Sequence, residues 1–371
     1  MLDITIGDGK GVAAAISDTR WTPGPGARLA SFGVVGLGYW GPNLARVLAA
    51  VRGVELRWLC DTDFARLDLH APSYPGARLA GDLDELLDDD ELDGVLLATP
   101  VFTHFDLARR CLEAGKHTFV EKPLATTAGQ ASSLVELARD RNLVLMCGHT
   151  FLYSPAVRVV RDLIAAGDTG ELYFISSSRV NLGLHRRDVG VIWDLGPHDF
   201  SILLHWLGAP PRSVRVSGRD SIMPGVIDVA FVTLEFDSGL IANVELSWLA
   251  PSKLRRTVIV GSKRMIVYVD GAAEPIKIYD RGVDYRDPET FGEYHLSYRS
   301  GDILAPRISS QEPLVLQIED FVERAATRAA STTELELARD VVRIAEAATA
   351  SLEGGGASVE LERQEFVRER R

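Results

Sequence analysis

Two short motifs place groups capable of chemistry at the ends of apolar runs. Gly36-Leu37-Gly38-Tyr39-Trp40-Gly41 follows one apolar run, and Glu121-Lys122-Pro123 follows another some eighty residues later. A glycine-rich turn is a place to bind a pyrophosphate. A lysine at the carboxyl end of a strand in the same sheet lies where cofactor and substrate meet. Together the two motifs indicate redox chemistry.

The residues around the turn complete a dinucleotide-binding fingerprint. Residues 32–35 predict a short buried strand, and residues 42–48 predict a helix with Pro42 in its first turn, where no amide hydrogen is needed. The first glycine permits the tight turn, the second lets the backbone approach the pyrophosphate, and the third lets helix pack on strand. The alternative is a glycine turn in some other α/β domain. The predicted cofactor-binding residues of this turn are Gly36, Gly38, Tyr39, Trp40 and Gly41.

An acidic residue follows the next predicted strand, residues 54–60. Asp61 lies about twenty residues past the fingerprint, where a carboxylate is expected to hold the ribose hydroxyls of NAD and repel the extra phosphate of NADP. The alternative for Asp61 is a helix cap. Arg66 is close enough in sequence to favour a phosphate, so NADP stays open as the less favoured cofactor.

Composition and charge limit the class of partner. The 371 residues are enough for two domains, and the net charge of −12 argues against nucleic acid or an anionic membrane. A small molecule is therefore the expected partner. The three cysteines, which lie in or beside apolar segments, predict reduced core residues and neither a disulfide framework nor a metal site. No stretch is long enough to span a bilayer, and the first residues do not form a leader peptide, so we expect a cytoplasmic protein.

Residues 1–28 predict an extension ahead of the fold, and residues 29–150 predict an NAD-binding Rossmann domain. Strands and helices alternate through this region, which favours a doubly wound parallel sheet. Ligands bind at the carboxyl ends of such strands, so we expect a cluster at the cofactor mouth. Its predicted members are Thr99, Pro100, Glu121, Lys122, Gly148 and His149, with His104 among the cofactor-binding residues.

Residues 151–371 predict a substrate-binding and oligomerisation domain of the α+β class. Strands at 228–236, 240–248, 256–260 and 265–269 follow one another with short reversals, which indicates a large, mostly antiparallel sheet. Several of these strands are apolar on both alternating faces. The domain's own helices can cover one face, and we expect a homodimer or homotetramer to cover the other. Two closing helices are predicted at residues 312–329 and 333–352.

The sequence resembles the glucose-fructose oxidoreductase, inositol dehydrogenase and rhizopine-catabolism family of NAD(P)-dependent sugar oxidoreductases. The resemblance covers about residues 31–361 and rests on the glycine turn, Ala98-Thr99-Pro100 with His104, Glu121-Lys122-Pro123 and Asp194-Leu195-Gly196-Pro197-His198. It implies that Lys122, Asp194 and His198 carry the chemistry, and that the Lys122–Pro123 peptide is often cis. The resemblance also implies a sugar dehydrogenase acting on CH–OH.

The residue types suit hydride removal from a secondary alcohol, whose hydroxyl proton must leave to a base. His198 is the candidate base, since a helix amino end disfavours imidazolium, while Asp194 shifts its pKa in the opposite direction; which effect wins stays open. Lys122 would stabilise developing alkoxide charge. The alternatives are a surface ion pair for Lys122, a capping or core role for His198, and a helix cap for Asp194. No metal site is indicated by the histidine spacing.

The substrate signal is weaker. Arg179, Asn181, Arg186 and Arg187 lie in a polar stretch before Asp194, and Tyr153 follows the cofactor domain. Such residues could hold sugar hydroxyls, a carboxylate or a diphosphate, or be structural. The candidate substrate-binding residues are Lys122, Tyr153, Arg179, Asn181, Asp194 and His198.

The segments 193–199, 247–249 and 298–302 are similar to those of UDP-N-acetylglucosamine or glucosaminuronate 3-dehydrogenases. We therefore expect oxidation at position 3 of a nucleotide-linked sugar. Three alternatives stay open: a nucleotide-sugar 3-ketoreductase of deoxysugar biosynthesis, an NAD-dependent glycosidase, and a non-catalytic NAD-binding regulator. The regulator would not need Lys122, Asp194 and His198 together.

Overall fold

A computed structural model describes residues 28–183, 185–186, 189–285, 296–329 and 331–361. The chain forms two compact units. Of the described residues, those in 28–121, 136–146 and 312–331 form the first unit, and those in 122–135, 147–311 and 332–361 form the second. The sequence predicted continuous domains with limits at residues 28 and 150, whereas each compact unit is made of several separate segments of the chain. The domain limits therefore stay predictions.

The first unit contains a six-stranded sheet in the order β3-β2-β1-β4-β5-β6. The pairings of β1 with β2 and β4, of β2 with β3, and of β4 with β5 are all parallel. The predicted doubly wound parallel sheet is confirmed. Its strands are β1 (Ala30–Val35), β2 (Val54–Cys60), β3 (Arg78–Ala80), β4 (Gly94–Leu97), β5 (His117–Val120) and β6 (Leu145–Cys147).

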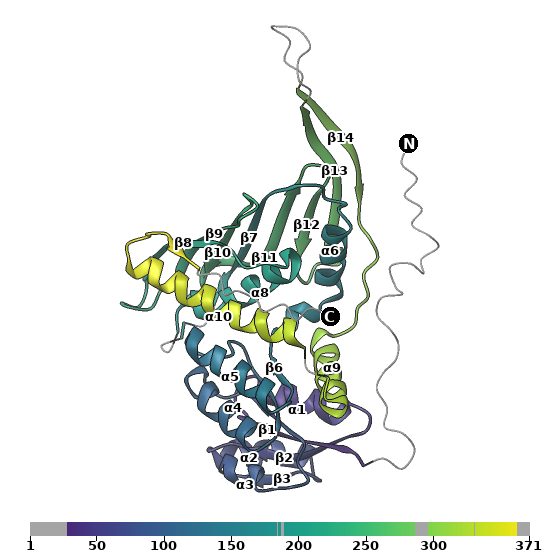
Figure 1. The fold of residues 1–371 in the computed structure, drawn as a ribbon, viewed down its shortest axis with the longest axis vertical. Coiled ribbons are helices and arrows are strands. Elements are labelled where there is room, and N and C mark those ends of the chain that lie inside the picture. Colours follow the sequence, from purple (N-terminus) through teal and green to yellow (C-terminus); the bar gives the residue numbers. More distant parts are fainter. Residues whose placement is uncertain (1–27, 184, 187–188, 286–295, 330, 362–371) are drawn as a thin grey trace. The chain divides into compact units, whose positions relative to one another are not determined.

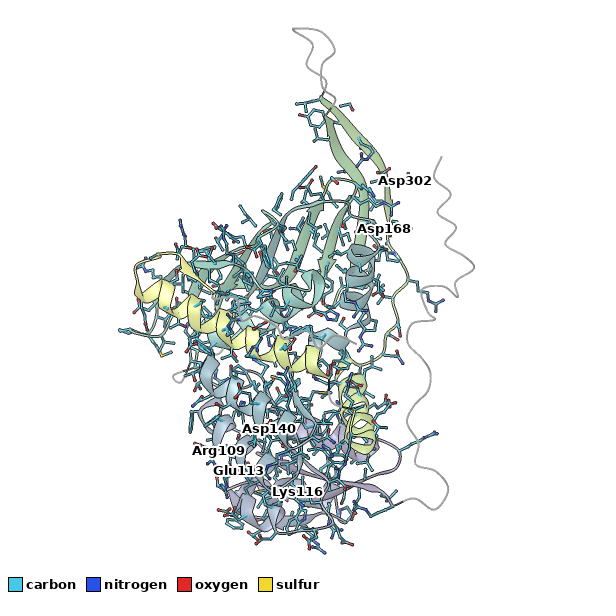
Figure 2. The ribbon with its side chains drawn as sticks, viewed as in Figure 1. Arg109, Glu113, Lys116, Asp140, Asp168 and Asp302 are labelled. Atoms are coloured by element: carbon cyan, nitrogen blue, oxygen red, sulfur yellow. The ribbon has the colours of Figure 1, made fainter. Side chains whose placement is uncertain are left out.

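Helices connect these strands, because parallel strands need a crossover connection, which is usually a helix. On the outer surface of α4, Arg109 and Glu113 lie one turn apart and form an ion pair of 2.9 Å (Figure 2). The connecting helices are α1 (Gly41–Ala50), α2 (Phe64–His70), α3 (Leu83–Leu87), α4 (His104–Glu113) and α5 (Ala128–Asp140), with the 3-10 turns η1 (Ala71–Ser73) and η2 (Val101–Thr103).

Helix α9 (Pro313–Thr327) also belongs to the first unit, whereas the sequence grouped it with the second domain. Phe321 is fully buried, and its ring lies 5.7 Å from the rings of both Phe32 on β1 and Phe119 on β5. The apolar face of α9 therefore completes the core under the parallel sheet. Helix α9 therefore belongs to the unit of the parallel sheet, although it lies more than 160 residues after the end of the predicted cofactor domain at residue 150.

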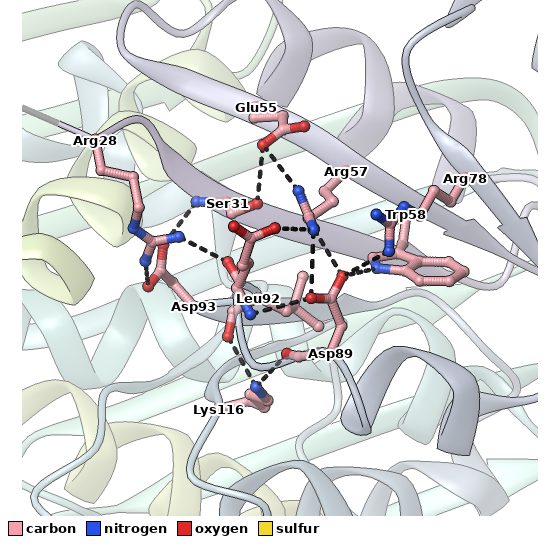
Figure 3. Close-up of polar contacts among 11 residues, drawn as sticks. Arg28, Ser31, Glu55, Arg57, Trp58, Arg78, Asp89, Leu92, Asp93 and Lys116 are labelled. Atoms are coloured by element: carbon pink, nitrogen blue, oxygen red, sulfur yellow. Dashed lines mark hydrogen bonds and ion pairs between the residues drawn. The ribbon is translucent and has the colours of Figure 1, made fainter.

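A polar network secures the edge of this sheet opposite the glycine turn (Figure 3). Asp89 accepts hydrogen bonds from Arg57 Nε at 2.6 Å and from Trp58 Nε1 at 2.8 Å. Lys116 Nζ donates to the carbonyl oxygens of Asp89 and Leu92 at 2.8 and 2.9 Å. The hydrogen bond from Arg57 is the largest cause that lowers the pKa of Asp89. These contacts stabilise the loop before β4. They lie away from the carboxyl ends of the strands, where ligands are expected to bind.

The second unit contains a nine-stranded sheet in the order β14-β13-β12-β11-β7-β10-β9-β8-β15. Among the described pairings of this second sheet, that of β7 with β10 is parallel and the others are antiparallel. The predicted mostly antiparallel sheet is confirmed. Its strands are β7 (Leu172–Leu182), β8 (Ser213–Arg219), β9 (Val229–Glu235), β10 (Ile241–Ser247), β11 (Leu249–Gly261), β12 (Met265–Val269), β13 (Ile276–Tyr285), β14 (Leu296–Leu304) and β15 (Val359–Glu360).

Helices cover one face of the second sheet. The helix α8 contacts β10, α6 and α10, and Phe200, at the centre of α8, is fully buried. The ribbon formed by β13 and β14 extends beyond the neighbouring strands (Figure 1), and the sequence analysis did not predict it. The helices and turn are η3 (Thr150–Tyr153), α6 (Pro155–Ala165), α7 (Val191–Asp194), α8 (Gly196–Leu207) and α10 (Thr332–Glu353).

Candidate active site

The glycine turn of the first unit has room for a ligand on one side only. Gly36 has φ of +89°, and a Cβ there would lie 2.7 Å from the carbonyl oxygen of Ala98. A Cβ on Gly41 would lie 1.8 Å from the carbonyl oxygen of Gly36, so the helix can approach the strand only without a side chain. At Gly38 a Cβ would meet only Arg66 Nη1, at 3.6 Å, within a 4 Å radius. The open backbone at Gly38 fits a pyrophosphate.

The amino end of α1 begins directly at this turn. Pro42 lies in its first turn, and no acidic side chain is present there to oppose the positive end of the helix dipole. Tyr39 is almost fully exposed, and its ring stacks on that of Trp40 with centroids 6.4 Å apart. The backbone amides and the helix end together suit an anionic group. These residues therefore fit a dinucleotide, although the individual cofactor contacts stay predictions.

Asp61 is buried at the end of β2 and bonds to backbone on both sides. Its Oδ2 accepts from the N–H of Leu37 at 2.6 Å, and its Oδ1 accepts from the N–H of Asp63 at 2.9 Å. The cap of α2 is Asp63, whose Oδ1 accepts from the N–H of Ala65 at 3.1 Å. The helix-cap reading of Asp61 is therefore wrong. An ionised carboxylate accepts about four hydrogen bonds, so Asp61 keeps capacity for ribose hydroxyls.

The other predicted cofactor residues lie at the carboxyl ends of β4 and β5. Thr99 receives a hydrogen bond on Oγ1 from Thr103, and its carbonyl oxygen lies 2.9 Å from Nε2 of the buried His104. Thr103 also donates to the carbonyl oxygen of Pro100 at 2.7 Å. The N–H of the buried Glu121 donates to Leu97 at 2.9 Å. His104 thus supports the strand-end backbone, and a direct contact with cofactor stays a prediction.

Lys122 and Asp194, far apart in sequence, meet in the second unit. Lys122 Nζ donates to the carbonyl oxygen of Asp194 at 2.9 Å and lies 3.7 Å from Asp194 Oδ1. Each side chain is one-fifth exposed, so the ammonium is accessible but partly desolvated. The Lys122–Pro123 peptide is cis. The ion pair is therefore part of a partly buried site, unlike the exposed surface pair considered from the sequence.

The Asp194 carboxylate accepts one hydrogen bond and lies within ion-pair distance of two cations. Its Oδ2 accepts a hydrogen bond of 3.2 Å from Trp248 Nε1, and its Oδ1 lies 3.7 Å from Arg186 Nη1 as well as from Lys122. Asp194 is the last residue of the short helix α7, and α8 starts two residues later. From the sequence, Trp248 stood out only as part of a family-like segment. Trp248 directly follows β10, so its contact with Asp194 depends on the position of that strand's end in the sheet.

His198 lies in the first turn of α8, with its ring against that of Phe151. The two ring centroids are 5.0 Å apart at an interplanar angle of 78°. Burial lowers the pKa of His198 well below its ordinary value, and the charges of Lys122, Arg179 and Arg255 lower it further. Burial and these neighbouring cations favour the neutral imidazole. Within the described residues, His198 Nδ1 has no hydrogen-bond partner.

A second buried histidine lies in the same unit as His198. His149 follows β6, is almost fully buried, and has no hydrogen-bond partner for either ring nitrogen within the described chain. Burial and then the charge of Lys122 lower the pKa of His149 to about 3. His149 in turn contributes to the lowered pKa of His198. The sequence signal was its position at a strand end, next to the predicted mouth.

The predicted substrate residues separate into two places. Arg179 is buried, pairs with Asp199, and has its guanidinium 4.7 Å from the ring of Phe151. Tyr153 is buried too, but its hydroxyl donates to Glu334 at 3.3 Å. Arg179 therefore lies on the aromatic ring that contacts His198, whereas Tyr153 bonds to α10. The substrate roles of both stay predictions.

Two of the predicted substrate residues lie on a strand and not in the polar loop expected from the sequence. Arg179 and Asn181 both belong to β7, which continues to Leu182 because it pairs with β10 and β11 on its two sides. Arg187 lies outside the described residues. Among the described residues, no group of three or more histidine, cysteine or acidic side chains is arranged to hold a metal ion. No described helix combines the length and apolarity needed to cross a membrane.

Comparison with known proteins supports the resemblance. The chain is 30% identical over 255 residues to UDP-N-acetylglucosamine 3-dehydrogenase from Acidithiobacillus ferrooxidans, a match that covers 67% of this chain and 77% of that protein. It is 28% identical to an uncharacterised oxidoreductase from Streptococcus pneumoniae, over 58% of this chain and 62% of that protein's length. The crystal structure of GenD2 from gentamicin A biosynthesis in complex with NAD has a TM-score of 0.76 at 27% identity, covering 91% of this chain and 97% of GenD2.

Two family models match consecutive parts of the chain. The first, described as an oxidoreductase family with an NAD-binding Rossmann fold, matches residues 30–149. The second, the C-terminal domain of the same family, matches residues 157–267. The predicted family and its NAD cofactor are confirmed. The chain belongs to the glucose-fructose oxidoreductase, inositol dehydrogenase and rhizopine-catabolism family of NAD-binding oxidoreductases.

Proposed function

We propose that this protein is an NAD-dependent dehydrogenase that oxidises a secondary ring hydroxyl of a sugar. The observation that carries the proposal is the contact of the Lys122 ammonium with Asp194, close to a neutral His198. A base and a hydrogen-bond donor for one oxygen are the two groups that alcohol oxidation needs. NAD, when bound, supplies the acceptor for the hydride.

In this proposal His198 takes the hydroxyl proton. Its lowered pKa keeps the imidazole neutral near pH 7, and the group is a base in that form. Lys122 donates a hydrogen bond to the same substrate oxygen and stabilises the negative charge that develops on it. Asp194, held by Trp248, fixes the direction of the ammonium through the Lys122 contact. For the reverse reaction Lys122 would polarise a ketone and His198 would return the proton.

The proposed substrate is a nucleotide-linked sugar oxidised at position 3. Support comes from the similarity to a UDP-N-acetylglucosamine 3-dehydrogenase and from the cations around the site. Arg179 and Arg255 both lie over the ring of Phe151, with Cζ at 4.7 and 5.7 Å from its centroid. Arg186 lies near Asp194. Arg179 and Arg255 are already paired with Asp199 and Asp270, so the half-exposed guanidinium of Arg186 is the better candidate to recognise phosphate or carboxylate oxygens.

The substrate is tested by a screen with purified protein and NAD. UDP-N-acetylglucosamine, its 6-carboxylate, free N-acetylglucosamine and myo-inositol are compared by NADH fluorescence, and the oxidised position is assigned by NMR. Oxidation of a nucleotide sugar at position 3 is the expected result. Faster turnover of the free sugar or inositol would contradict the nucleotide-sugar assignment. Sugar release without net NADH would favour the glycosidase alternative, and faster reduction of a 3-keto nucleotide sugar would favour the ketoreductase.

We also infer that the enzyme works in the cytoplasm as a homodimer or homotetramer formed through the second sheet. On the face away from the helices, Phe174 and Ile241 are register partners on β7 and β10, and each is nearly half exposed. Phe231 on β9 is exposed to a similar extent. Light scattering on the purified protein tests this assignment. A dimer or tetramer that Ile241→Glu dissociates is expected, and a monomeric parent would contradict it.

A further inference from the structure

The ring of His149 is buried, and neither of its nitrogens is paired. The residue is only 3% exposed, and both Nδ1 and Nε2 lack a hydrogen-bond partner within the described residues. The backbone of His149 is paired: its N–H donates to the carbonyl oxygen of Cys147 at 2.7 Å, and its carbonyl oxygen accepts from the N–H of Leu152 at 3.0 Å. Buried polar atoms without partners cost stability. The described part of the chain therefore holds this residue by its backbone and leaves both ring nitrogens for another partner.

Two other buried histidines show what a structural role requires. His117 Nδ1 accepts a hydrogen bond from the N–H of Val144 at 3.0 Å, and His104 Nε2 lies 2.9 Å from the carbonyl oxygen of Thr99. Each of these rings supports the backbone of a neighbouring segment through one nitrogen. The ring of His149 supports no backbone group in this way. Its burial is therefore not explained by a structural hydrogen bond.

The unpaired ring belongs to the same unit as the groups proposed for catalysis. His149 directly precedes η3, and the ring of Phe151 in this turn lies 5.0 Å from that of His198. Burial, and then the charge of Lys122, lower the pKa of both His149 and His198. The pKa of His149 falls to about 3, so its ring is neutral at pH 7. A neutral imidazole with two unpaired nitrogens thus lies near the proposed base and the proposed donor.

The charge state of the ring limits the kind of group that it can bind. A neutral imidazole has one nitrogen that donates and one that accepts. A hydroxyl both donates and accepts, so it can pair with either nitrogen. A carboxylate or phosphate offers acceptors alone, and a cation is repelled by Lys122. The ring of His149 therefore suits a neutral hydroxyl better than an ion.

We propose that His149 binds a second hydroxyl of the substrate, on a carbon next to the one that is oxidised. The inference rests on the proposed function, in which Lys122 and His198 contact the hydroxyl that reacts. A hydroxyl on the adjacent ring carbon stays close to these two groups when the reacting hydroxyl is bound. In N-acetylglucosamine, position 2 carries an acetamido group, so the neighbour of position 3 that carries a hydroxyl is position 4. His149 is then the residue that selects sugars by their 4-hydroxyl.

The test compares UDP-N-acetylglucosamine with its 4-deoxy analogue in the parent and in His149→Leu, which has a side chain of similar size without polar atoms. For the natural sugar we expect kcat/KM to fall about 10²-fold in the variant, because the 4-hydroxyl is buried without a partner. For the 4-deoxy analogue, parent and variant should agree within about threefold. His149→Gln keeps a donor and an acceptor and should recover about tenfold of the loss. If the parent oxidises another sugar, the pair is that sugar and its analogue without the hydroxyl beside the oxidised carbon.

The free energy of unfolding separates substrate binding from a structural role. Because both nitrogens are unpaired, His149→Leu should be at least as stable as the parent at neutral pH. His205→Leu is the matched control: burial lowers the pKa of this α8 histidine to about 4, and the variant should keep the parent's kcat/KM on both compounds.

Two results would overturn the proposal. One is an equal loss of kcat/KM on both compounds in His149→Leu, and the other is a loss of stability that accompanies the loss of activity. A parent protein that oxidises no sugar at all contradicts the proposed function itself.

Discussion

The two units build their parts of the chemistry in different ways. In the first unit, the glycine turn and Asp61 come from one strand-turn-helix-strand segment, and backbone groups supply most of the contacts. In the second unit, Lys122, Asp194, His198 and Trp248 come from separate segments and act through side chains. Several buried polar atoms of the second unit have no partner within the described residues, among them both ring nitrogens of His149, His198 Nδ1 and Arg179 Nη1, and Trp40 Nε1 in the glycine turn has none either.

The difference indicates what each unit is adapted to do. A site made of backbone groups that are already in place before the ligand binds is suited to bind the pyrophosphate, which is the same in every dinucleotide. Unpaired buried polar atoms cost stability and are expected where a protein needs unsatisfied groups for chemistry. Substitutions in the first unit should therefore change cofactor affinity, and those in the second should change rate.

The largest effect is expected for His198→Asn. Loss of the proposed base should lower kcat about 10³-fold, within the usual range for general base catalysis, and leave the affinity for NAD within about twofold of the parent. Steady-state rates and fluorescence titration with NAD measure the two quantities. His205→Asn, a histidine in the last turn of the same helix, is the matched control. Equal losses in the two variants would mean that α8 is merely destabilised.

A large effect on the first unit is expected for Phe321→Ala on α9. The ring is fully buried against Phe32 and Phe119, and its removal should lower the free energy of unfolding by about 3–5 kcal/mol. The cavity would lie under the parallel sheet, which carries the predicted NAD site. We therefore expect a lower affinity for NAD in the variant, while kcat measured at saturating NAD stays near the parent value. Chemical denaturation with NAD titration measures both. Unchanged stability would contradict the assignment of α9 to this core.

A smaller effect in both units is expected from pH. Burial lowers the pKa of His117 in the first unit to about 4 and that of His149 in the second to about 3. The unfolded chain takes up these protons near pH 6.5, whereas the folded chain does not, so stability falls as pH falls below about 6.5. Each histidine should contribute up to about 1.4 kcal/mol per pH unit until its folded pKa is reached.

The pH prediction is measured by denaturation between pH 7.5 and pH 5. His149→Gln should show a shallower loss of stability over this interval than the parent, because one titrating group is gone. Above pH 7 the two curves should run parallel. A slope that is identical in parent and variant would show that His149 titrates normally in the folded protein. That outcome would remove the evidence for a low pKa beside Lys122.

The smallest effect is expected for Trp248→Phe, which removes the indole N–H that donates to Asp194. The bond is 3.2 Å long, and its loss should lower kcat about fivefold, the equivalent of about 1 kcal/mol. Trp206→Phe is the matched control, since its indole N–H donates at 2.9 Å to the carbonyl oxygen of Val157 within the core. A loss of activity confined to Trp248→Phe is expected. Equal losses would mean that Trp248 has no specific part in holding Asp194.

Sequence reasoning worked best where the determinants are local. The glycine turn, its flanking strand and helix, and Asp61 all lie within one continuous segment, so their periodicity and spacing predicted the geometry. Lys122, Asp194 and His198 were found from two short motifs, and the structure brings Lys122 and Asp194 into direct contact. The sequence offered a helix cap only as the alternative for Asp61; the hydrogen bonds from Leu37 to Asp61 and from Ala65 to Asp63 show that Asp63 is the cap of α2.

The parts that sequence reasoning missed depend on contacts between distant segments. The strand β7 continues through Arg179 and Asn181 because β10 and β11 pair with it, which a polar stretch does not reveal. Phe151 meets His198 only when η3 packs against α8. The placement of α9 likewise depends on Phe321, whose ring packs against Phe32 on β1 and Phe119 on β5, about 200 or more residues earlier in the sequence.

The most direct test of the central claim is the single-turnover rate of NADH formation in Lys122→Met at saturating NAD and substrate. We expect a fall of at least about 10²-fold relative to the parent, because the donor to the developing alkoxide is lost, with NAD affinity nearly unchanged. Lys253→Met, at an exposed lysine on β11, should react at the parent rate. A parent-like rate in Lys122→Met would contradict the account.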